Sequence, residues 1–489
     1  MKTYPLYLNG QFVTSEPAWE IVNPATGKAF ARISTITRAR LSEAIADAHA
    51  AFPAWRALTA KTRSEYLRRL AMELERRREE VARLMSTENG KPLAQAFSEV
   101  AMSVDHLQWF AEEGRRAYGR IIPPQADGKR NLVIKTPVGV VGAISPWNFP
   151  LVLAVRKVAP ALAAGCPVVL KPARQTPLSC VALAECAQTA GLPPGVLQVV
   201  CGPSDQFGEE FLANPLCRKV TFTGSTEVGQ VLIREAAKNV KPLSLELGGN
   251  APLLVFDDAD LAVAVEGALL AKMRNTGQTC IAANRFYVQQ GIYPRFLEAF
   301  VAKTATLKVG EFSEPGLEIG PLINEPALRH ALELVQDAVS GGARVACGGQ
   351  RLDRPGCFLA PTVLAEVPPA ARCWREEIFA PVAPIATFET EAEAIRLAND
   401  TVHGLSAYVF TRDLDRVFRL GEQIEAGMIG INDGLPTTSN APFGGVKQSG
   451  WGRELGFEGL DAFLETKHLS LRVDDLNDSP PGKTPSASR

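Results

Sequence analysis

Short runs of β-branched residues alternate with helical segments along most of this 489-residue chain, and this alternation limits the possible folds more than any other feature. Buried strands that are joined by helices predict a parallel α/β sheet. A first series has predicted strands at 138–144, 168–170, 196–200 and 219–222. A second series begins near Pro252 and has further predicted strands at 285–288, 363–367, 382–388, 407–411 and 427–432. Two such series predict two α/β domains.

Other segments flank the two series. Residues 38–117 carry apolar side chains three and four positions apart, which predicts helices. Residues 119–136 are typical of a polar hairpin, and 462–472 of a late strand without a core of its own. Residues 474–489 contain three prolines among serines and threonines, so we expect a disordered tail there.

Charge and hydropathy exclude two classes of partner. The chain has 52 Lys and Arg against 53 Asp and Glu, a net charge of -1, so no overall positive field attracts nucleic acid. The most apolar region, 132–158, is interrupted by Lys135, Arg156 and three prolines, and is too polar for a membrane span. Residues 1–23 lack a basic stretch followed by an apolar run, so we expect no secretory signal.

The nine cysteines form no C-x-x-C pair, and their odd number does not fit a disulfide framework. Five scattered histidines offer no ligand cluster, so we expect no metal site, which argues against a metal-dependent alcohol dehydrogenase. A cytoplasmic protein of a reducing compartment is therefore predicted.

One cysteine stands in an unusual setting, Gly277-Gln278-Thr279-Cys280-Ile281. A cysteine that follows a glycine turn and opens a helix-like run would gain thiolate character from the helix N-terminus. On its own, the segment fits a buried structural cysteine better, because free cysteines are usually buried and inert. Polar residues set among glycine and proline, as in site-forming loops, also occur in four other segments: 146–150 (PWNFP), 245–250 (LELGGN), 376–381 (EEIFAP) and 442–447 (PFGGVK).

A possible phosphate site lies at 222–229, which follows a predicted strand and opens a helix. Backbone N–H groups there could face a pyrophosphate. Gln230 stands where a P-loop has its lysine, and the chain contains no G-x-G-x-x-G sequence. The pattern alone therefore indicates a phosphate site only weakly.

Taken together, these segments resemble the aldehyde dehydrogenases over nearly the whole chain, and most of all the succinate-semialdehyde dehydrogenase branch. The motifs occur in the family's order, including the 34-residue interval from Glu246 to Cys280. The resemblance implies two Rossmann-like α/β domains and a β-hairpin arm used in a homo-oligomer, a dimer or tetramer. We assign 1–118 and 138–248 to the cofactor-binding domain, 249–448 to the catalytic domain, and 119–137 with 460–473 to the oligomerisation arm.

The resemblance also implies catalytic roles. Cys280 matches the nucleophile that attacks the aldehyde, and Asn148 matches the donor that holds the resulting oxyanion. Glu246 matches the base that activates the deacylating water, although a structural ion pair would also explain it. Glu454 matches a position that passes the proton outward, with a surface pair to Arg453 as the alternative. We assign Lys157, near the site, only a structural role.

The implied cofactor is NAD or NADP, and it would contact residues that the family uses at matching positions: Trp147, Lys171, Arg174, Gly224, Ser225, Leu247, Glu377 and Phe379. One departure concerns Arg174, which stands where many NAD-preferring relatives carry a glutamate. That glutamate repels a 2′-phosphate, whereas an arginine removes the repulsion and offers a donor. We therefore predict that NADP is accepted.

The substrate implied is a short aldehyde with a distal carboxylate, most readily succinic semialdehyde oxidised to succinate. Arg156 and Arg274 match two carboxylate-binding arginines of the branch, and Thr437 stands where the branch has a serine. Taken singly, either arginine could instead form an ordinary salt bridge.

Departures from the branch keep other activities open. The segment 435–441 differs from the branch pattern, so glutarate semialdehyde, another acidic aldehyde or a broad specificity stays possible. Ala282 stands where some branch members have a second cysteine, so we expect no disulfide switch. A CoA-acylating dehydrogenase is disfavoured by Glu246, and a non-catalytic relative by the intact Cys280, Glu246 and Asn148.

Overall fold

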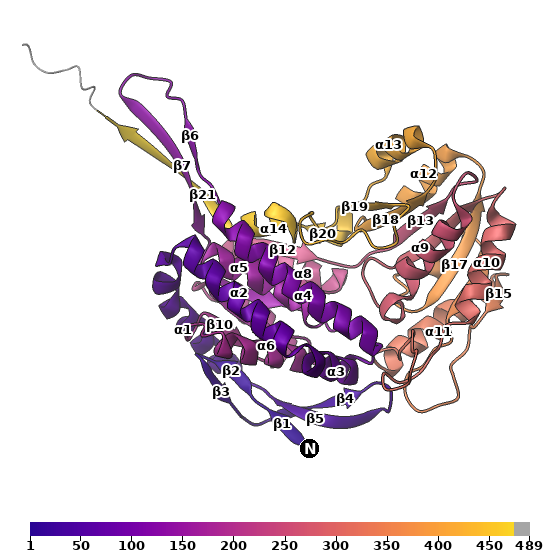
Figure 1. Cartoon of the computed structure of the whole chain (residues 1–489), viewed down its shortest axis with the longest axis horizontal. Coiled ribbons are helices and arrows are strands. Elements are labelled where there is room, and N and C mark those ends of the chain that lie inside the picture. The colour runs from indigo at the N-terminus through magenta and orange to yellow at the C-terminus, as the bar shows by residue number, and fades with distance from the viewer. Residues whose placement is uncertain (474–489) are drawn as a thin grey trace, which may run out of the picture.

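The computed structural model of the chain describes residues 1–473, which form two large sheets flanked by helices, a small N-terminal sheet and a projecting arm (Figure 1). The predicted tail at 474–489 lies outside the described residues. Both large sheets are mainly parallel, which confirms the predicted α/β class with two Rossmann-like units. None of the helices in this part of the chain combines the length and apolar character needed to cross a bilayer.

The first large sheet has eight strands in the order β20-β12-β11-β8-β9-β10-β2-β3. Its five central strands run parallel, whereas β20 at one edge and β2 and β3 at the other pair antiparallel. The sequence predicts β8 to β11 but not β12, whose LSLE sequence contains no β-branched residue. The strands are β2 (Leu6–Leu8), β3 (Gln11–Val13), β8 (Val140–Ile144), β9 (Val168–Lys171), β10 (Leu197–Val199), β11 (Cys217–Thr223), β12 (Leu243–Glu246) and β20 (Gly450–Trp451).

Helices cover both faces of this sheet. On one face α5 (Val152–Ala164) and α6 (Leu178–Thr189) lie beneath the outer helices α2 (Ala60–Arg76), α3 (Arg78–Asn89) and α4 (Leu93–Glu113). On the other face are α1 (Arg38–Ala57), α7 (Ser204–Ala213) and α8 (Thr226–Ala236).

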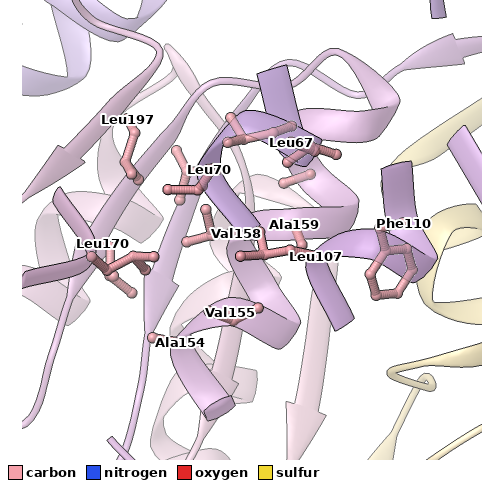
Figure 2. Packing of buried hydrophobic residues seen from close by; sticks show 14 of the residues in the cluster. Leu67, Leu70, Leu107, Phe110, Ala154, Val155, Val158, Ala159, Leu170 and Leu197 are labelled. Atoms are coloured by element: carbon pink, nitrogen blue, oxygen red, sulfur yellow. The ribbon is translucent and has the colours of Figure 1, made fainter. Parts of the chain in front are cut away.

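The largest apolar core lies between the outer helices and the sheet. Leu67 and Leu70 of α2, spaced three residues apart, meet Leu107 of α4 and Val158 of α5 above Leu170 of β9 (Figure 2). Helical spacing places these side chains on one face of each helix, and their burial stabilises the layer by roughly 1.5–3 kcal/mol per side chain. This layer fixes α5, which begins next to the predicted site.

The second large sheet has seven strands in the order β15-β16-β17-β14-β13-β18-β19, and only the β15–β16 pair is antiparallel. Alternate residues of β13 enter opposite cores, Leu253 on the side of α9 and α10 and Leu254 on the side of α11. Its elements are β13 (Ala251–Val255), α9 (Leu261–Met273), β14 (Ala283–Gln289), α10 (Tyr293–Ala305), α11 (Glu325–Ser340), β15 (Arg344–Cys347), β16 (Thr362–Ala365), β17 (Val382–Phe388), α12 (Glu391–Asn399), β18 (Ser406–Phe410), α13 (Leu414–Gln423) and β19 (Met428–Ile431).

Two small sheets complete the molecule. The arm pairs β7 (Lys129–Pro137) with β6 (Arg120–Ile122) and with the late strand β21 (Leu464–Arg472), and it projects from the body (Figure 1). The N-terminal sheet has the order β1-β5-β4. Its strands, and the remaining short elements, are β1 (Lys2–Tyr4), β4 (Ala18–Asn23), β5 (Lys28–Ser34), α14 (Gly456–Asp461) and the 3₁₀ turns η1 (Gly114–Arg116), η2 (Ala237–Asn239), η3 (Arg274–Gly277), η4 (Arg372–Trp374) and η5 (Lys447–Ser449).

Candidate active site

Loops at the carboxyl ends of three strands meet where the strand order of the first sheet reverses. From β8 the sheet grows through β9 and β10 on one side, and from β11 through β12 on the other. Such a reversal opens a crevice in which α/β proteins bind ligands. Asn148 follows β8, Gly224 and Ser225 follow β11, and Glu246 is the last residue of β12. The sheet topology therefore places four predicted site residues around one crevice.

Cys280 lies in a turn between η3 and β14. No helix begins at this residue, so the expected effect of a helix N-terminus on its thiol is wrong. Burial instead raises the pKa of the Cys280 thiol to about 12, and the nearby Glu377 and Glu246 carboxylates add to the rise. The thiol is therefore protonated at neutral pH in this state, and nucleophilic attack requires removal of that proton.

The backbone before Cys280 is left-handed over three consecutive residues. Asn275, Thr276 and Gly277 have φ angles of 49°, 60° and 73°. A β-branched residue in this region is strained by about 1–3 kcal/mol and persists only where its surroundings hold it. The Thr276 hydroxyl donates to the Gly320 carbonyl at 3.2 Å, and the Gly320 N–H donates back at 3.1 Å. This exchange anchors the strained turn that presents the cysteine.

Gly249 brings the segment after β12 against the cysteine. A Cβ atom at Gly249 would lie only 2.1 Å from the carbonyl oxygen of Cys280, so no other residue fits without a shift of the backbone. The Gly249 N–H also donates to Glu377 Oε1 at 3.1 Å. The glycine pair of the LELGGN segment thus lets Glu246 and Cys280 approach each other from different sheets.

Asn148 is buried, and its side-chain amide faces the main chain just before Cys280. Asn148 Nδ2 donates to the Gln278 carbonyl at 3.1 Å. A primary amide carries two N–H groups, so a second donor is available to a ligand. Within residues 1–473, Asn148 Oδ1 has no hydrogen-bond partner. The side chain is oriented by this bond to Gln278 and keeps one N–H group for a further acceptor.

Glu246 belongs to a buried cluster of charges. Its pKa is raised well above the usual value, first by burial and then by the neighbouring Glu454 carboxylate. Lys157 Nζ donates to Glu454 Oε1 and to Thr223 Oγ1, both at 2.6 Å. Gly444 makes room for the carboxylate, since a Cβ there would lie 2.8 Å from Glu246 Oε1.

The surface pair between Glu454 and Arg453 that the sequence left open is not formed. Glu454 is only 5% exposed, and its partner is the buried Lys157. Arg453 instead donates to the main-chain carbonyls of Gly445 and Gly452. Lys157, which the sequence suggested only as a structural residue, therefore belongs to the charge cluster at Glu246.

A small pocket beside Cys280 brings the three predicted substrate residues together, since Arg156, Arg274 and Thr437 all line it. The Arg156 guanidinium lies 4.3 Å from the centre of the Phe443 ring and 4.0 Å from Glu454 Oε2. The remaining residues of the wall are mainly apolar: Met102, Phe149, Val152, Leu153, Thr279, Ile281 and Phe443.

Arg274 differs from Arg156 in having no carboxylate within 4 Å among the described residues. Its guanidinium lies 4.9 Å from the centre of the Phe149 ring and donates to the Met102 sulfur at 3.7 Å. Burial lowers the pKa of Arg274. An unneutralised guanidinium in an apolar pocket suits a carboxylate of the ligand.

A larger cleft of about 1090 Å³ opens from this pocket between α4 and α9. Met102 and Arg274 line both spaces, and the cleft continues along Leu270 and Leu435.

A separate cavity of about 740 Å³ lies between α7 and α8, and Ser204, Val228 and Val231 line it. Both valines are 47% exposed, which leaves an apolar slot suited to a flat ring. Lys171 Nζ donates to Ser204 Oγ at 2.9 Å, next to this slot. Ser225 caps the first turn of α8, whose free N–H groups suit a phosphate. The cavity and the start of α8 thus share Val228, and the cofactor role of the residues after β11 stays a prediction.

The other predicted cofactor residues lie on segments next to strands of both large sheets. The Trp147 and Phe379 rings meet edge to face with centroids 5.5 Å apart. Burial raises the pKa of Glu377 to about 7. Leu247 packs tightly on α8, since a Cβ at Gly229 would lie 2.6 Å from its side chain.

Arg174 stands apart from this group. Its exposed guanidinium lies 4.9 Å from the centre of the Trp19 ring, in a different cleft that Glu20 and Glu325 also line. It does not line the cavity between α7 and α8. Contact with a 2′-phosphate would require another rotamer, and the effect on NADP stays a prediction.

Sequence reasoning missed the residues behind Asn148. Lys91, Glu99 and Asn275 are buried, and each contacts the segment that carries Asn148. Glu99 gave a usable signal, since it falls at helical spacing with the apolar Ala96 and Leu107 of α4. No group of three or more His, Cys, Asp or Glu side chains in residues 1–473 is arranged to hold a metal ion.

The model of the aldehyde dehydrogenase family matches residues 12–469. The chain therefore belongs to the aldehyde dehydrogenase family, as the sequence resemblance predicted.

Individual proteins are also similar to this chain over almost its whole length. The chain is 50% identical to a glutarate-semialdehyde dehydrogenase of Pseudomonas putida over 96% of this chain and 97% of that protein. It is 49% identical to an NADP-dependent succinate-semialdehyde dehydrogenase of Escherichia coli, over 95% and 97% of the two chains. A crystal structure of an NADP-dependent enzyme of E. coli superposes with a TM-score of 0.95 at 48% identity, covering 96% of this chain and 98% of the other.

Proposed function

We propose that the protein oxidises a short aldehyde with a distal carboxylate to the corresponding acid, using NAD or NADP, with succinic semialdehyde as the main candidate. The observation that carries this proposal is the pocket at Cys280, whose wall includes the unneutralised Arg274 guanidinium and Arg156. The dicarboxylic semialdehyde dehydrogenases among the relatives support the same substrate class.

In the first half-reaction the Cys280 thiol gives its proton to water, and the sulfur attacks the aldehyde carbonyl carbon and gives a thiohemiacetal oxyanion. The free N–H of Asn148 Nδ2 and the main-chain N–H of Cys280 hold this oxygen. Removal of one such donor slows comparable reactions by about 10²–10³-fold. When bound, the nicotinamide cofactor supplies the hydride acceptor, and the oxidised carbon remains on Cys280 as a thioester.

In the second half-reaction Glu246 takes a proton from water as the water oxygen attacks the thioester carbon. The C–S bond breaks, the acid leaves, and the Cys280 thiolate is regenerated. Burial raises the pKa of Glu246, which makes the ionised carboxylate a stronger base. Glu454 and Lys157 lie beside it and would carry the proton away from the site.

The cofactor would lie across the crevice of the first sheet. Its adenine end fits the cavity of Val228 and Val231, with Lys171 at the ribose. Gly224 and Ser225 at the start of α8 would hold the pyrophosphate. At the other end, Glu377 would bind the nicotinamide ribose beside Trp147, Leu247 and Phe379.

Glutaric semialdehyde is the second candidate, because the similarity to a glutarate-semialdehyde dehydrogenase is as high as that to the succinate enzyme. The two substrates differ by one methylene, which is worth only about 1 kcal/mol in an apolar pocket. A broad-specificity dehydrogenase is the remaining alternative.

We further propose that the arm of 119–137 and 460–473 joins copies of the chain in a dimer or tetramer. The arm exposes apolar side chains on a projecting sheet, including Ile121 at 78% and Leu471 at 40% exposure. In the same proposal, 1–118 with 138–248 binds the cofactor and 249–448 carries the nucleophile. All nine cysteines are free, which fits a reducing compartment such as the cytoplasm.

A panel of four aldehydes tests the activity: succinic and glutaric semialdehydes, neutral propanal, and a cationic aminoaldehyde, each with NAD and with NADP. We expect the two acidic aldehydes to have the highest kcat/KM, and Cys280→Ala to abolish formation of the reduced cofactor. A higher kcat/KM for propanal or the aminoaldehyde would overturn the substrate assignment. Stimulation of turnover by added CoA would indicate an acylating enzyme instead.

A further inference from the structure

A buried ion pair that the mechanism does not use lies directly behind Asn148. Lys91, between α3 and α4, donates to Glu99 Oε2 of α4 at 2.5 Å, and both side chains are fully buried. Buried pairs are expensive to desolvate, and they often give no net stability. The position of the pair behind Asn148 therefore suggests a role other than stabilising the fold.

Lys91 and Glu99 contact the segment that carries Asn148 at two different points. Lys91 Nζ donates to the main-chain carbonyl of Asn148 at 2.8 Å. Glu99 Oε1 accepts from the N–H groups of Leu151 at 3.0 Å and Val152 at 3.2 Å, which cap the start of α5. One pair thus fixes both the carbonyl of Asn148 and the helix that follows it.

The same carbonyl is also held from the side of the nucleophile. Asn275 Nδ2 donates to Asn148 O at 2.9 Å and to Gln278 O at 3.2 Å. Gln278 O is the acceptor that orients the Asn148 side chain. Lys91 and Asn275 therefore meet at one oxygen, and this junction sets how the Asn148 amide lies relative to the Cys280 turn.

We infer that Lys91, held by Glu99, is a positioning residue for the oxyanion donor Asn148. It touches neither substrate nor cofactor and acts through the main chain of Asn148. This inference rests on the proposed function, in which Asn148 donates to the oxyanion. A displacement of about 1 Å in such a donor lowers the rate by on the order of 10²-fold.

A double-mutant cycle tests the inference, with the single-turnover rate of reduced-cofactor formation as the readout. We expect Lys91→Met to lower this rate by about 10–100-fold while the Kd of the cofactor changes less than about twofold. In the Asn148→Ala background, Lys91→Met should lower the rate by less than about threefold, because the group it positions is already missing. Equal effects of Lys91→Met in both backgrounds would overturn the inference, as would a wild-type rate in Lys91→Met.

A second comparison covers the case in which Lys91→Met fails to fold. Glu99→Gln keeps an oxygen for the α5 amides but removes the charge that holds Lys91. Glu88→Gln is the matched control, because Glu88 is also buried and caps the neighbouring α6 through the N–H groups of Leu178 and Ser179. We expect a rate at least about fivefold lower in Glu99→Gln and within about twofold of wild type in Glu88→Gln. Equal rates in the two variants would overturn the inference.

The cycle also separates failure of the inference from failure of the proposed function. If Asn148→Ala alone keeps the wild-type rate, the oxyanion role of Asn148 is wrong, and the positioning role falls with it. If Asn148→Ala is slow but Lys91→Met slows both backgrounds equally, the oxyanion role stands and only the positioning role is wrong.

Discussion

The Glu454 carboxylate accepts a hydrogen bond from the Lys157 ammonium at 2.6 Å, and both side chains are buried. Glu246 shares this desolvated region, and the charge of Glu454 adds to the burial that raises the pKa of Glu246. The cationic Lys157 and Arg156 act in the opposite direction. The protonation of the proposed base therefore depends on the balance of its buried neighbours.

Glu454→Gln should move the acidic limb of the pH profile of kcat to lower pH, by about one unit. The substitution removes a negative charge beside Glu246 and leaves Lys157 unneutralised, and both changes lower the pKa of Glu246. The base acts only when ionised, so activity is lost as the pH falls through that pKa. Rates from pH 5 to 9 under deacylation-limited conditions measure the shift. The exposed Glu465→Gln on the arm is the control, and an upward shift in Glu454→Gln contradicts the prediction.

Arg274→Met and Arg156→Met should have different effects on KM and on the pH profile. Arg274 has no carboxylate partner in the described chain, so its loss should raise KM for succinic semialdehyde about 10–100-fold and leave propanal nearly unchanged. Arg156 lies 4.0 Å from Glu454, so its loss should also change the pH profile with propanal. Steady-state kinetics with both aldehydes distinguish the two. Equal effects of Arg274→Met on both aldehydes would show that Arg274 does not bind the carboxylate.

Arg174→Glu should lower kcat/KM for NADP by at least about tenfold relative to NAD, because a carboxylate at the adenosine ribose repels a 2′-phosphate. Gln175→Glu places the same charge one residue along the chain and serves as the control. The ratio of kcat/KM values for the two cofactors is the measurement. An unchanged ratio in Arg174→Glu would mean that the guanidinium stays at Trp19 and leaves cofactor choice to other groups.

Gly249→Ala should abolish turnover, since the added methyl group would lie 2.1 Å from the Cys280 carbonyl oxygen. Either the LELGGN segment or the cysteine turn must then shift, which separates Glu246 from Cys280. Gly421→Ala in α13 is the control, because its Cβ meets no atom within 4 Å. Activity assays on both variants, with circular dichroism to verify folding, test this close approach. Full activity in Gly249→Ala would refute it.

The sequence predicts the parallel sheets because the buried strands β8 and β13 are long enough to show uninterrupted apolar runs. It does not predict the edge strands β2, β3 and β20, whose sequences LYL, QFV and GW lack a β-branched run such as the one around β10. These edge strands are defined by the partner that they meet, as Tyr7 of β2 pairs with Val199 of β10. Such long-range pairing leaves little trace in the local sequence.

The site likewise contains residues that the sequence indicates and residues that it does not. Cys280 and Glu246 stand in glycine-containing segments that local chemistry makes visible. Their buried partners give no such signal, because lysines and glutamates are common in any sequence and only the fold brings these ones together. Lys157 and Glu454, for example, are far apart in the chain. The sequence predicts that Gly277 forms the turn before a helix, whereas in the structure Gly277 ends a left-handed turn that precedes β14.

The pairing of β12 with β20 also has a consequence for synthesis of the chain. β20 covers the edge of β12 at Glu246, which pairs with Gly450. A ribosome delivers the other strands of the first sheet long before it delivers β20. The growing chain therefore carries its proposed base on an uncovered sheet edge until β20, about 200 residues further along the chain, has been made. A product that stops before β20 keeps Cys280 but never encloses Glu246, so we expect premature termination to yield an inactive protein with an open edge that favours aggregation.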